Sequence, residues 1–336
     1  MKAVGYYHPL PIDDSHALED IELPTPTLKE RDLLVRVKAI SVNPVDTKVR
    51  SGNAPEAGAA KVLGWDAVGT VEAIGSAVTR FKTGDRVYYA GAINRPGTNS
   101  ELHAVDERIV ALAPASLDNA QAAALPLTSI TAYELLFDRL CVPKGGGEGK
   151  TLLIVGAAGG VGSILIQLAR QLTKLRVIAT ASRPETRQWC LDLGAHAVID
   201  HAKPLSDELK TGGFGEVDFV ACLTQTRQHY THIIESLKPQ GRLGVIDDMG
   251  MLDLMLLKSK SISLHWELMF TRSLYETPDM DEQGKLLTEI AQLIDAGRLR
   301  TTVNAHFGTI NAANLRKAHA LIESGKSQGK LVLEGF

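Results

Sequence analysis

The chain has 336 residues, 44% of them hydrophobic and 22% charged, and this length predicts two domains. The apolar content excludes a disordered chain, and a formal net charge of −3 disfavours a generic nucleic-acid binder. The start has no apolar signal segment, no stretch approaches the roughly 18 apolar residues of a membrane span, and the three cysteines are too scattered for a disulfide framework. We therefore expect a reduced, cytoplasmic protein.

Short runs of β-forming residues, separated by Gly, Pro and Asn, fill the N-terminal part of the chain. The runs are DLLVRVKAISV at 32–42, AVGTVEAIG at 67–75, DRVYYAG at 85–91 and ERIVALAP at 107–114. Such spacing predicts an all-β, barrel-like domain.

From about residue 127, apolar runs alternate with amphipathic stretches of helical length. The runs are TLLIV at 151–155, RVIATA at 176–181, AVID at 197–200, VDFVACL at 217–223 and GRLGVID at 241–247, with SISLHWELM at 261–269 as a candidate sixth. Unbroken apolar runs are typical of parallel strands covered on both faces. We therefore predict an α/β fold with a six-stranded, doubly wound Rossmann sheet.

The last stretch holds two amphipathic helices and a strand. The helices are expected at 282–297 and 311–325, each ended by a glycine, and the strand is GKLVLEGF at 329–336. Periodicity alone leaves open whether this stretch completes the sheet domain or returns to the β domain.

A glycine-rich turn, GAAGGVG at 156–162, follows one predicted strand directly and opens a predicted helix. Gly159 would let the backbone approach a pyrophosphate, and Gly162 would let the helix pack closely on the strand. The free N–H groups at the helix start favour a diphosphate. Because Ala157 replaces the first glycine of the usual G-x-G-x-x-G pattern, a turn without a ligand is the alternative.

Six motifs occur in an order that resembles a known family. They are SVNPVDTKVRSG (41–52), KVLGWDAVGTVEAIGSAVTRFKTGDRV (61–87), INRPGTNSELHAVDERIVALAP (93–114), AAALPLTSITAYELL (122–136), VGAAGGVG (155–162) and GKLVL (329–333). Together they resemble the medium-chain dehydrogenase/reductase superfamily, in its zinc-free quinone oxidoreductase branch and the subset labelled zinc-type alcohol dehydrogenase-like. The resemblance implies a GroES-like catalytic domain built from 1–126 and 270–336. It also implies a Rossmann NADP-binding domain at 127–269, with the nicotinamide in the cleft between the domains.

The resemblance also indicates where a catalytic zinc would be held, which takes three Cys, His or carboxylate ligands. Those positions are occupied here by Asn43, Trp65 and Leu127. Asp66 alone keeps a carboxylate, and the four-cysteine structural zinc lobe is missing. His229 and His232 are spaced i, i+3 without a third ligand, so we expect surface histidines. We predict no zinc and no other metal.

Three residues are expected at the reacting atoms by the same resemblance. Asn43 would donate its amide to a substrate carbonyl, and Lys48 would donate a hydrogen bond or relay a proton from solvent. Trp65 would form an aromatic wall over flat acceptors. The alternatives are an Asx turn before proline for Asn43, an exposed strand-edge lysine for Lys48 and a core tryptophan for Trp65. Asp46 we interpret as a structural acceptor.

Other positions are implied for the cofactor. Thr128 and Thr131 match residues that approach the nicotinamide and its ribose in relatives. Lys330 matches a basic residue that reaches the cofactor from the tail, unless it only caps a surface strand. The residues of the glycine turn expected at the diphosphate are Ala158, Gly159, Gly160, Val161 and Gly162.

The choice between NADPH and NADH depends on the end of the second Rossmann strand. An NAD enzyme carries an acid about 20 residues after the glycine turn, but Ala181 stands there, 19 residues after Gly162. The groups available to a 2′-phosphate are Ser182, Arg183 and Arg187. Thr186 replaces the lysine usual in relatives, and His201 replaces their frequent tyrosine. We predict NADPH, the alternative being that both arginines only decorate a helix start.

These observations predict an NADPH-dependent oxidoreductase that reduces quinones or α,β-unsaturated carbonyls by direct, metal-free hydride transfer. The alternatives are a zinc-independent aldehyde or ketone reductase or alcohol dehydrogenase, and a non-catalytic NADPH-binding protein. We expect a small-molecule quinone or enone substrate and neither a nucleic-acid nor a membrane partner. Because relatives often pair Rossmann sheet edges, a homodimer through 261–269 is expected.

Overall fold

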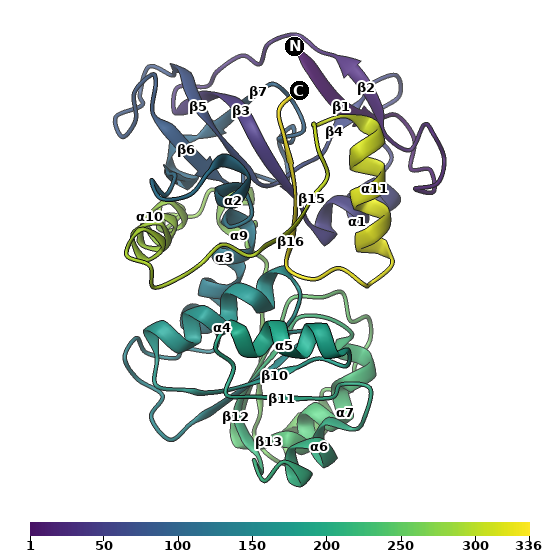
Figure 1. Ribbon diagram of the computed structural model, residues 1–336, viewed down its shortest axis with the longest axis vertical. Coiled ribbons are helices and arrows are strands. Elements are labelled where there is room, and N and C mark those ends of the chain that lie inside the picture. Colours follow the sequence, from purple (N-terminus) through teal and green to yellow (C-terminus); the bar gives the residue numbers. More distant parts are fainter. The chain divides into compact units, whose positions relative to one another are not determined.

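A computed structural model describes residues 1–336 of the protein, and internal contacts divide the chain into two compact units. Unit 1 combines Met1–Ile130 with Phe270–Phe336, and unit 2 is Thr131–Met269 (Figure 1). None of the helices combines the length and hydrophobicity that crossing a bilayer requires.

Unit 1 is built around the long strand β3 (Asp32–Val42), which pairs antiparallel with three other strands. Its sheet runs in the order β15-β16-β3-β5-β6-β8, with β7 also on β3, and a second sheet runs β2-β1-β4. The other strands are β1 (Lys2–Tyr6), β2 (Glu19–Glu22), β4 (Lys61–Val62), β5 (Ala67–Ile74), β6 (Arg86–Tyr89), β7 (Leu102–Asp106), β8 (Val110–Leu112), β15 (Val303–His306) and β16 (Lys330–Glu334). The predicted β-rich N-terminal region is thus confirmed.

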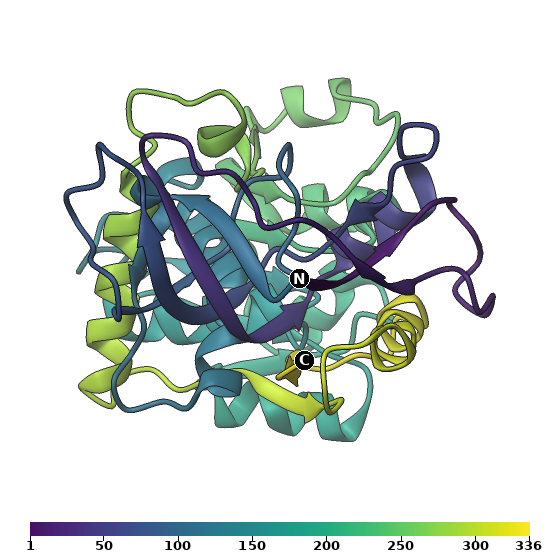
Figure 2. The same cartoon turned by 90° about the horizontal axis from the view of Figure 1, so that it is seen from above.

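The C-terminal stretch joins this same sheet. In β16, Leu331 lies opposite Val42 of β3, and the two strands run antiparallel. The helices of this unit are α1 (Pro44–Gly52), α2 (Asn119–Ala123), α3 (Pro126–Tyr133, which runs into unit 2), α9 (Thr271–Leu274), α10 (Glu282–Asp295) and α11 (Ala312–Glu323), with a 3-10 turn at Glu107–Ile109. Seen from above, α10 and α11 flank the strands on opposite sides (Figure 2).

Helix α1 starts where β3 ends. Proline fits the first helical position because its missing N–H would have no partner there, and Pro44 occupies it. The Asp46 carboxylate then accepts the Asn43 backbone N–H at 2.6 Å, which closes the helix start. Lys48 therefore lies on an exposed helix face, so a strand-edge lysine was the wrong alternative for it.

Unit 2 is the predicted doubly wound sheet of six parallel strands, in the order β11-β10-β9-β12-β13-β14. The strands are β9 (Thr151–Val155), β10 (Arg176–Thr180), β11 (Ala197–Ile199), β12 (Val217–Cys222), β13 (Leu237–Val245) and β14 (Ser263–Trp266). The helices are η2 (Glu134–Arg139, a π-helix), α4 (Gly160–Leu172), α5 (Pro184–Asp192), α6 (Leu205–Thr211), α7 (Thr226–Ser236) and α8 (Met255–Lys258). Helices α4 and α5 pack beside β9 to β11, and α7 packs on β12 and β13.

The core of unit 2 shows why the apolar runs became strands. Nearly every residue of β9, β10 and β12 is buried, as parallel strands with helices on both faces require. Parallel strands end at one edge, so Gly156, Ala181 and His201 follow β9, β10 and β11 there. The strand order reverses between β9 and β12, and ligands of doubly wound sheets bind at such a switch point.

Candidate active site and cofactor site

The glycines of the turn at 156–162 have different structural roles. Gly156 has a φ of +79°, a backbone conformation that favours glycine. A Cβ on Gly162 would lie 2.4 Å from the Ala157 carbonyl oxygen, so this glycine allows close packing of α4. A Cβ on Gly159 would meet nothing nearer than the Gly156 carbonyl oxygen at 3.5 Å, and its φ is −73°. The fold therefore does not require glycine at 159, whereas a ligand approaching the backbone does.

Helix α4 begins beside Gly159 with backbone donors. Gly160, Val161 and Gly162 form its first turn, where N–H groups lack partners within the helix. Ser163 donates its hydroxyl to the Gly159 carbonyl at 2.7 Å and accepts the Trp189 indole N–H at 2.8 Å. This start fits the diphosphate of a nicotinamide cofactor, which the N–H groups and the helix dipole would hold.

The two arginines after β10 have different partners. Arg187 donates to the carbonyls of Ala181 at 3.2 Å and Val198 at 2.8 Å, which ties two strand ends together. Arg183 has a side chain 40% exposed and lies 3.2 Å from the Glu185 carboxylate, and Ser182 next to it is exposed. Arg183 and Ser182 are therefore better placed for a 2′-phosphate than Arg187.

His201 is connected to the glycine turn. Its Nδ1 lies 3.2 Å from the Thr180 hydroxyl, which accepts the Gly156 N–H at 3.1 Å. Burial lowers the pKa of His201, and the charge of Arg183 acts in the same direction.

A second histidine, which the sequence analysis placed on the surface, lies beside His201. His229 is only 6% exposed, and its ring centroid is 6.3 Å from that of His201. The surface prediction was wrong for His229 because the face of α7 that carries it packs inward. It was right for His232, whose side chain is 38% exposed and pairs with Glu235 at 3.1 Å.

In unit 1 the candidate catalytic residues surround the buried carboxylate of Asp66. Its Oδ2 accepts the Ser41 hydroxyl at 2.7 Å and the Asn43 amide N–H at 2.8 Å. Its Oδ1 accepts the backbone N–H of Leu127 at 2.7 Å. Two of the three positions that the resemblance assigns to zinc ligands, Asn43 and Leu127, therefore bond to Asp66, through a side-chain amide and a backbone donor.

The fourth partner of Asp66 is the ammonium group of Lys330, which is 3% exposed. The ammonium lies 3.0 Å from Asp66 Oδ2 and 3.2 Å from the Val42 carbonyl, and it also donates to the Asn43 side-chain oxygen. These bonds account for the three donors of a lysine. The alternative of a lysine capping a surface strand was wrong, and the bonds favour a positioning role over direct contact with a cofactor.

The other predicted site residues of unit 1 are buried, except Lys48. Trp65 is 1% exposed, donates its indole N–H to the Ala92 carbonyl at 3.3 Å and meets Phe270 edge-on, which favours a core tryptophan over an aromatic wall. The Thr128 hydroxyl donates to the Leu125 carbonyl at 3.2 Å, and Thr131, the first residue of unit 2, is also buried. Their approach to the nicotinamide stays a prediction.

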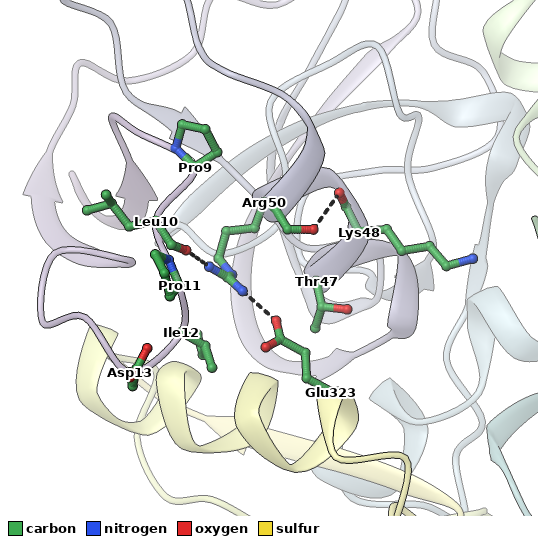
Figure 3. A pocket seen from close by; sticks show the side chains of 10 residues that line it. Pro9, Leu10, Pro11, Ile12, Asp13, Thr47, Lys48, Arg50 and Glu323 are labelled. Atoms are coloured by element: carbon green, nitrogen blue, oxygen red, sulfur yellow. Dashed lines mark hydrogen bonds and ion pairs between the residues drawn. The ribbon is translucent and has the colours of Figure 1, made fainter.

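Lys48 lies beside a hollow of about 600 Å3, which is bordered by α1, α11 and the loop Pro9–Asp13. Arg50 on its wall is buried and donates to the Leu10 carbonyl and the Glu323 carboxylate. The Lys48 side chain extends away from both contacts (Figure 3). Burial raises the pKa of Asp46, on the same helix, to about 7.

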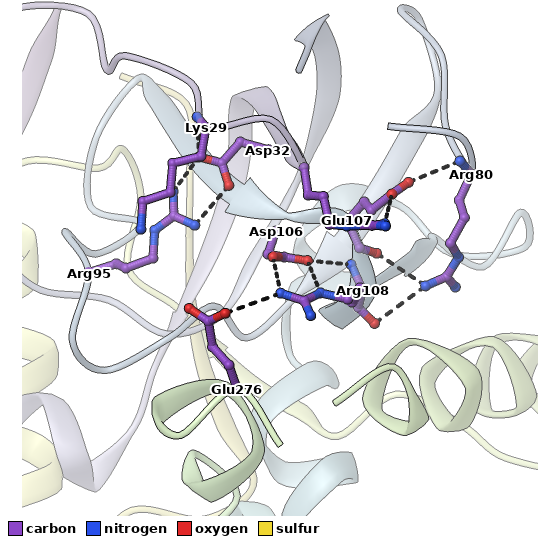
Figure 4. Close-up of polar contacts among 9 residues, drawn as sticks. Lys29, Asp32, Arg80, Arg95, Asp106, Glu107, Arg108 and Glu276 are labelled. Carbon is purple, nitrogen blue, oxygen red and sulfur yellow. Dashed lines mark hydrogen bonds and ion pairs between the residues drawn. The ribbon is translucent and has the colours of Figure 1, made fainter. Parts of the chain in front are cut away.

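A charged cluster elsewhere in unit 1 was not predicted from the sequence. Its arginines are paired with acids: Arg95 with Asp32 at 2.7 Å, Arg108 with Asp106 at 2.8 Å and Arg31 with Glu107 at 3.0 Å (Figure 4). These pairs connect β3, β7 and the turn that follows β7. Because the charges compensate one another, we assign the cluster a structural role.

The structure holds no group of three or more His, Cys, Asp and Glu side chains placed to bind a metal ion.

Comparison with known proteins identifies the class that this fold and site define. The alcohol dehydrogenase GroES-like domain matches residues 29–115, and the zinc-binding dehydrogenase family matches residues 193–333. The chain belongs to the medium-chain dehydrogenase/reductase superfamily and is an oxidoreductase of its alcohol dehydrogenase and quinone oxidoreductase family.

Within that superfamily the chain is similar to zinc-type alcohol dehydrogenase-like proteins. One from Staphylococcus aureus strain MSSA476 is 42% identical over 99% of both chains. The NADPH-dependent alkenal/one oxidoreductase of Arabidopsis thaliana is 38% identical over 55% of this chain and 48% of its own length.

Two solved structures have the same fold. A candidate zinc-dependent alcohol dehydrogenase from Rhizobium etli CFN 42 has a TM-score of 0.96 and 56% identity, covering 100% of this chain and 98% of its own. Escherichia coli quinone oxidoreductase, solved with NADPH, has a TM-score of 0.84 and 26% identity, covering 99% and 100%.

We predict that valine at two glycines separates ligand binding from folding. Gly159→Val should abolish NADPH binding and leave the fold intact, because only the ligand needs the space. Gly162→Val should lower the free energy of unfolding by about 1–3 kcal/mol, because its side chain meets backbone. Cofactor fluorescence titration and circular dichroism measure the two effects. Unchanged NADPH affinity in Gly159→Val would remove this turn from the cofactor site.

We also predict that Lys330→Met lowers the free energy of unfolding by about 3–5 kcal/mol, because Asp66 is left as an unpaired buried charge. Adding Asp66→Asn should restore much of that loss. Lys326→Met, at an exposed lysine of the same segment, is the matched control and should change stability by less than about 0.5 kcal/mol. Urea denaturation measures all three, and equal stability of the two lysine variants would contradict the importance of the pair.

Proposed function

We propose that the protein is an NADPH-dependent oxidoreductase that reduces quinones or α,β-unsaturated carbonyls without a metal ion. The observation that carries this proposal is the pairing of Asp66 with Lys330. Asp66, next to Trp65, is the one carboxylate kept beside the zinc-ligand positions, and the ammonium group of Lys330 already pairs with it. The names of the Arabidopsis and Escherichia coli relatives support the substrate class and the cofactor.

When bound, the nicotinamide supplies a hydride, and reduction of a quinone or enone delocalises the resulting negative charge into the ring or enolate. The chain then needs to orient the substrate and donate hydrogen bonds to the developing oxyanion. Asn43 has one amide N–H beyond its bond to Asp66, and we assign that N–H to a substrate carbonyl. Lys48, on the exposed face of α1, is assigned to relaying a proton from solvent.

The assembly and location that we propose are a homodimer in the cytoplasm. Strand β14 lies at the edge of its sheet, and Trp266 at its end is 54% exposed. An edge strand offers unpaired backbone groups to a second copy. The three cysteines are free, which is compatible with a reducing compartment.

The proposed reaction predicts the behaviour of metal-free protein. After dialysis against a chelator, the protein should contain far less than one zinc per chain and should still oxidise NADPH with quinones and enones. Simple alcohols should be inert. Elemental analysis and a steady-state panel of quinones, enones, aldehydes and alcohols provide the measurements. Stoichiometric zinc that survives dialysis, or turnover of alcohols alone, would overturn the proposal.

A second prediction concerns cofactor choice. Native protein should bind NADPH about 10- to 100-fold more tightly than NADH, because one charged hydrogen bond to the 2′-phosphate contributes a difference in binding free energy of that size. Arg183→Ala should lose most of this preference. Arg187→Ala should weaken both cofactors similarly, because Arg187 fixes the strand ends. Dissociation constants for both cofactors test this, and equal native affinities, or a preference untouched by both substitutions, would show that the assignment is wrong.

A further inference from the structure

Two histidines lie together at the carboxyl edge of the unit 2 sheet. His201 follows β11, and His229 lies in the first part of α7. Their rings are 6.3 Å apart between centroids and tilted by 57°. His201 is half-buried, and His229 behind it is almost fully buried. The sequence analysis did not predict that these two histidines lie together.

The charged groups around the pair come from several elements. Those acting on His201 are Asp200 and Arg183, and those acting on His229 are His201, His232 and Asp247. Asp247 already accepts the backbone N–H of Thr226 at 3.0 Å and also its hydroxyl, so it caps α7. His232 pairs with Glu235 at 3.1 Å. His201 therefore has a cation and a second imidazole as close neighbours, and Asp200 as its nearby acid.

These surroundings determine the charge of the pair in the free protein. Burial lowers the pKa of both rings, and for His229 the neighbouring His201 lowers it further. Two imidazolium rings this close would repel each other, so the first to be protonated disfavours the second. Near neutral pH the two rings therefore carry at most one added proton between them.

A 2′-phosphate would change this balance. It carries between one and two negative charges near pH 7, and in the proposed function it is held by Ser182 and Arg183. Arg183 comes three residues after Thr180, whose hydroxyl lies 3.2 Å from His201 Nδ1, and its charge lowers the pKa of His201. An anion bound at this arginine opposes that effect and favours the imidazolium form of His201.

We propose that binding of the cofactor's 2′-phosphate is coupled to uptake of one proton by His201, while the buried ring of His229 stays neutral. The inference rests on the proposed function, since it needs NADPH to bind at this edge. The cofactor preference of the protein then depends on pH.

The direction of the effect follows from linkage. A ligand that raises the pKa of a group binds more tightly where that group is protonated. NADPH affinity is therefore highest at the low end of the range above about pH 6 in which the 2′-phosphate keeps its second charge. It falls by up to about tenfold per pH unit until the pKa in the complex is passed. NADH, which lacks the phosphate, shows no such slope.

The experiment measures dissociation constants of NADPH and NADH for the full chain between about pH 6.5 and 8.5. Calorimetry in two buffers of different ionisation enthalpy counts the protons taken up. For the native protein we expect up to one proton per NADPH and none for NADH. His201→Gln should bind NADPH with a nearly flat pH profile and without proton uptake. His229→Asn should keep the native slope and proton uptake, because His201 is protonated before His229.

His232→Gln is the matched control, because this histidine lies on the same helix but has a partly exposed side chain that pairs with Glu235. It should keep the native profile. NADH affinity and the thermal midpoint verify the fold of each variant, and His201→Asn replaces His201→Gln if the latter unfolds.

The outcomes separate the two proposals. NADPH binding that is independent of pH and takes up no proton overturns the coupling and leaves the proposed function intact. A slope that survives in both His201 variants overturns the assignment to His201. A His229→Asn variant that binds NADPH without taking up a proton would place the uptake on His229 and overturn the assignment to His201. Absence of NADPH binding at every pH overturns the proposed function and the coupling with it.

Discussion

The buried carboxylate of Asp66 imposes a constraint on much of unit 1, because an unpaired charge in an apolar interior costs several kcal/mol. Strand β3 brings Ser41 and Asn43 to it, the start of α3 provides the Leu127 N–H, and β16 provides Lys330. The arrangement also defines the chemistry. In this superfamily a metal ion can provide the positive charge at this place, and here a side chain of the chain itself does so.

In unit 2 the main constraint is the close packing of helix α4 against the backbone of the glycine turn. Gly162 is needed for α4 to lie close to β9, whereas Gly159 is not needed by any contact within the protein. One turn thus holds a glycine that packing requires and a glycine that no contact within the protein requires. Beyond the turn, Thr180 links Gly156 to His201, so the diphosphate end and the adenosine end of the proposed cofactor site share one hydrogen-bonded chain.

Local pattern was enough to predict the strands of unit 2, because strands covered on both faces read as unbroken apolar runs. It was also enough for the glycine turn. Helix α1 was missed, although Pro44 after Asn43 is a helix-start signal. The burial of Lys330 and Trp65 and the meeting of His201 with His229 depend on residues far apart in sequence. Periodicity carries no information on such contacts, so these parts of the site needed the structure.

The pairing of β16 with β3 also bears on how the chain is assembled during translation. Domains fold largely as units as the chain emerges. Unit 2 is continuous in sequence, so all of its strands are available once residue 269 has been made. Unit 1 has to wait, since Lys330 is 264 residues from Asp66. During that interval the nascent N-terminal sheet exposes an open edge on β3 and an uncompensated acid, so chaperone capture or misassembly at this edge should peak late in synthesis.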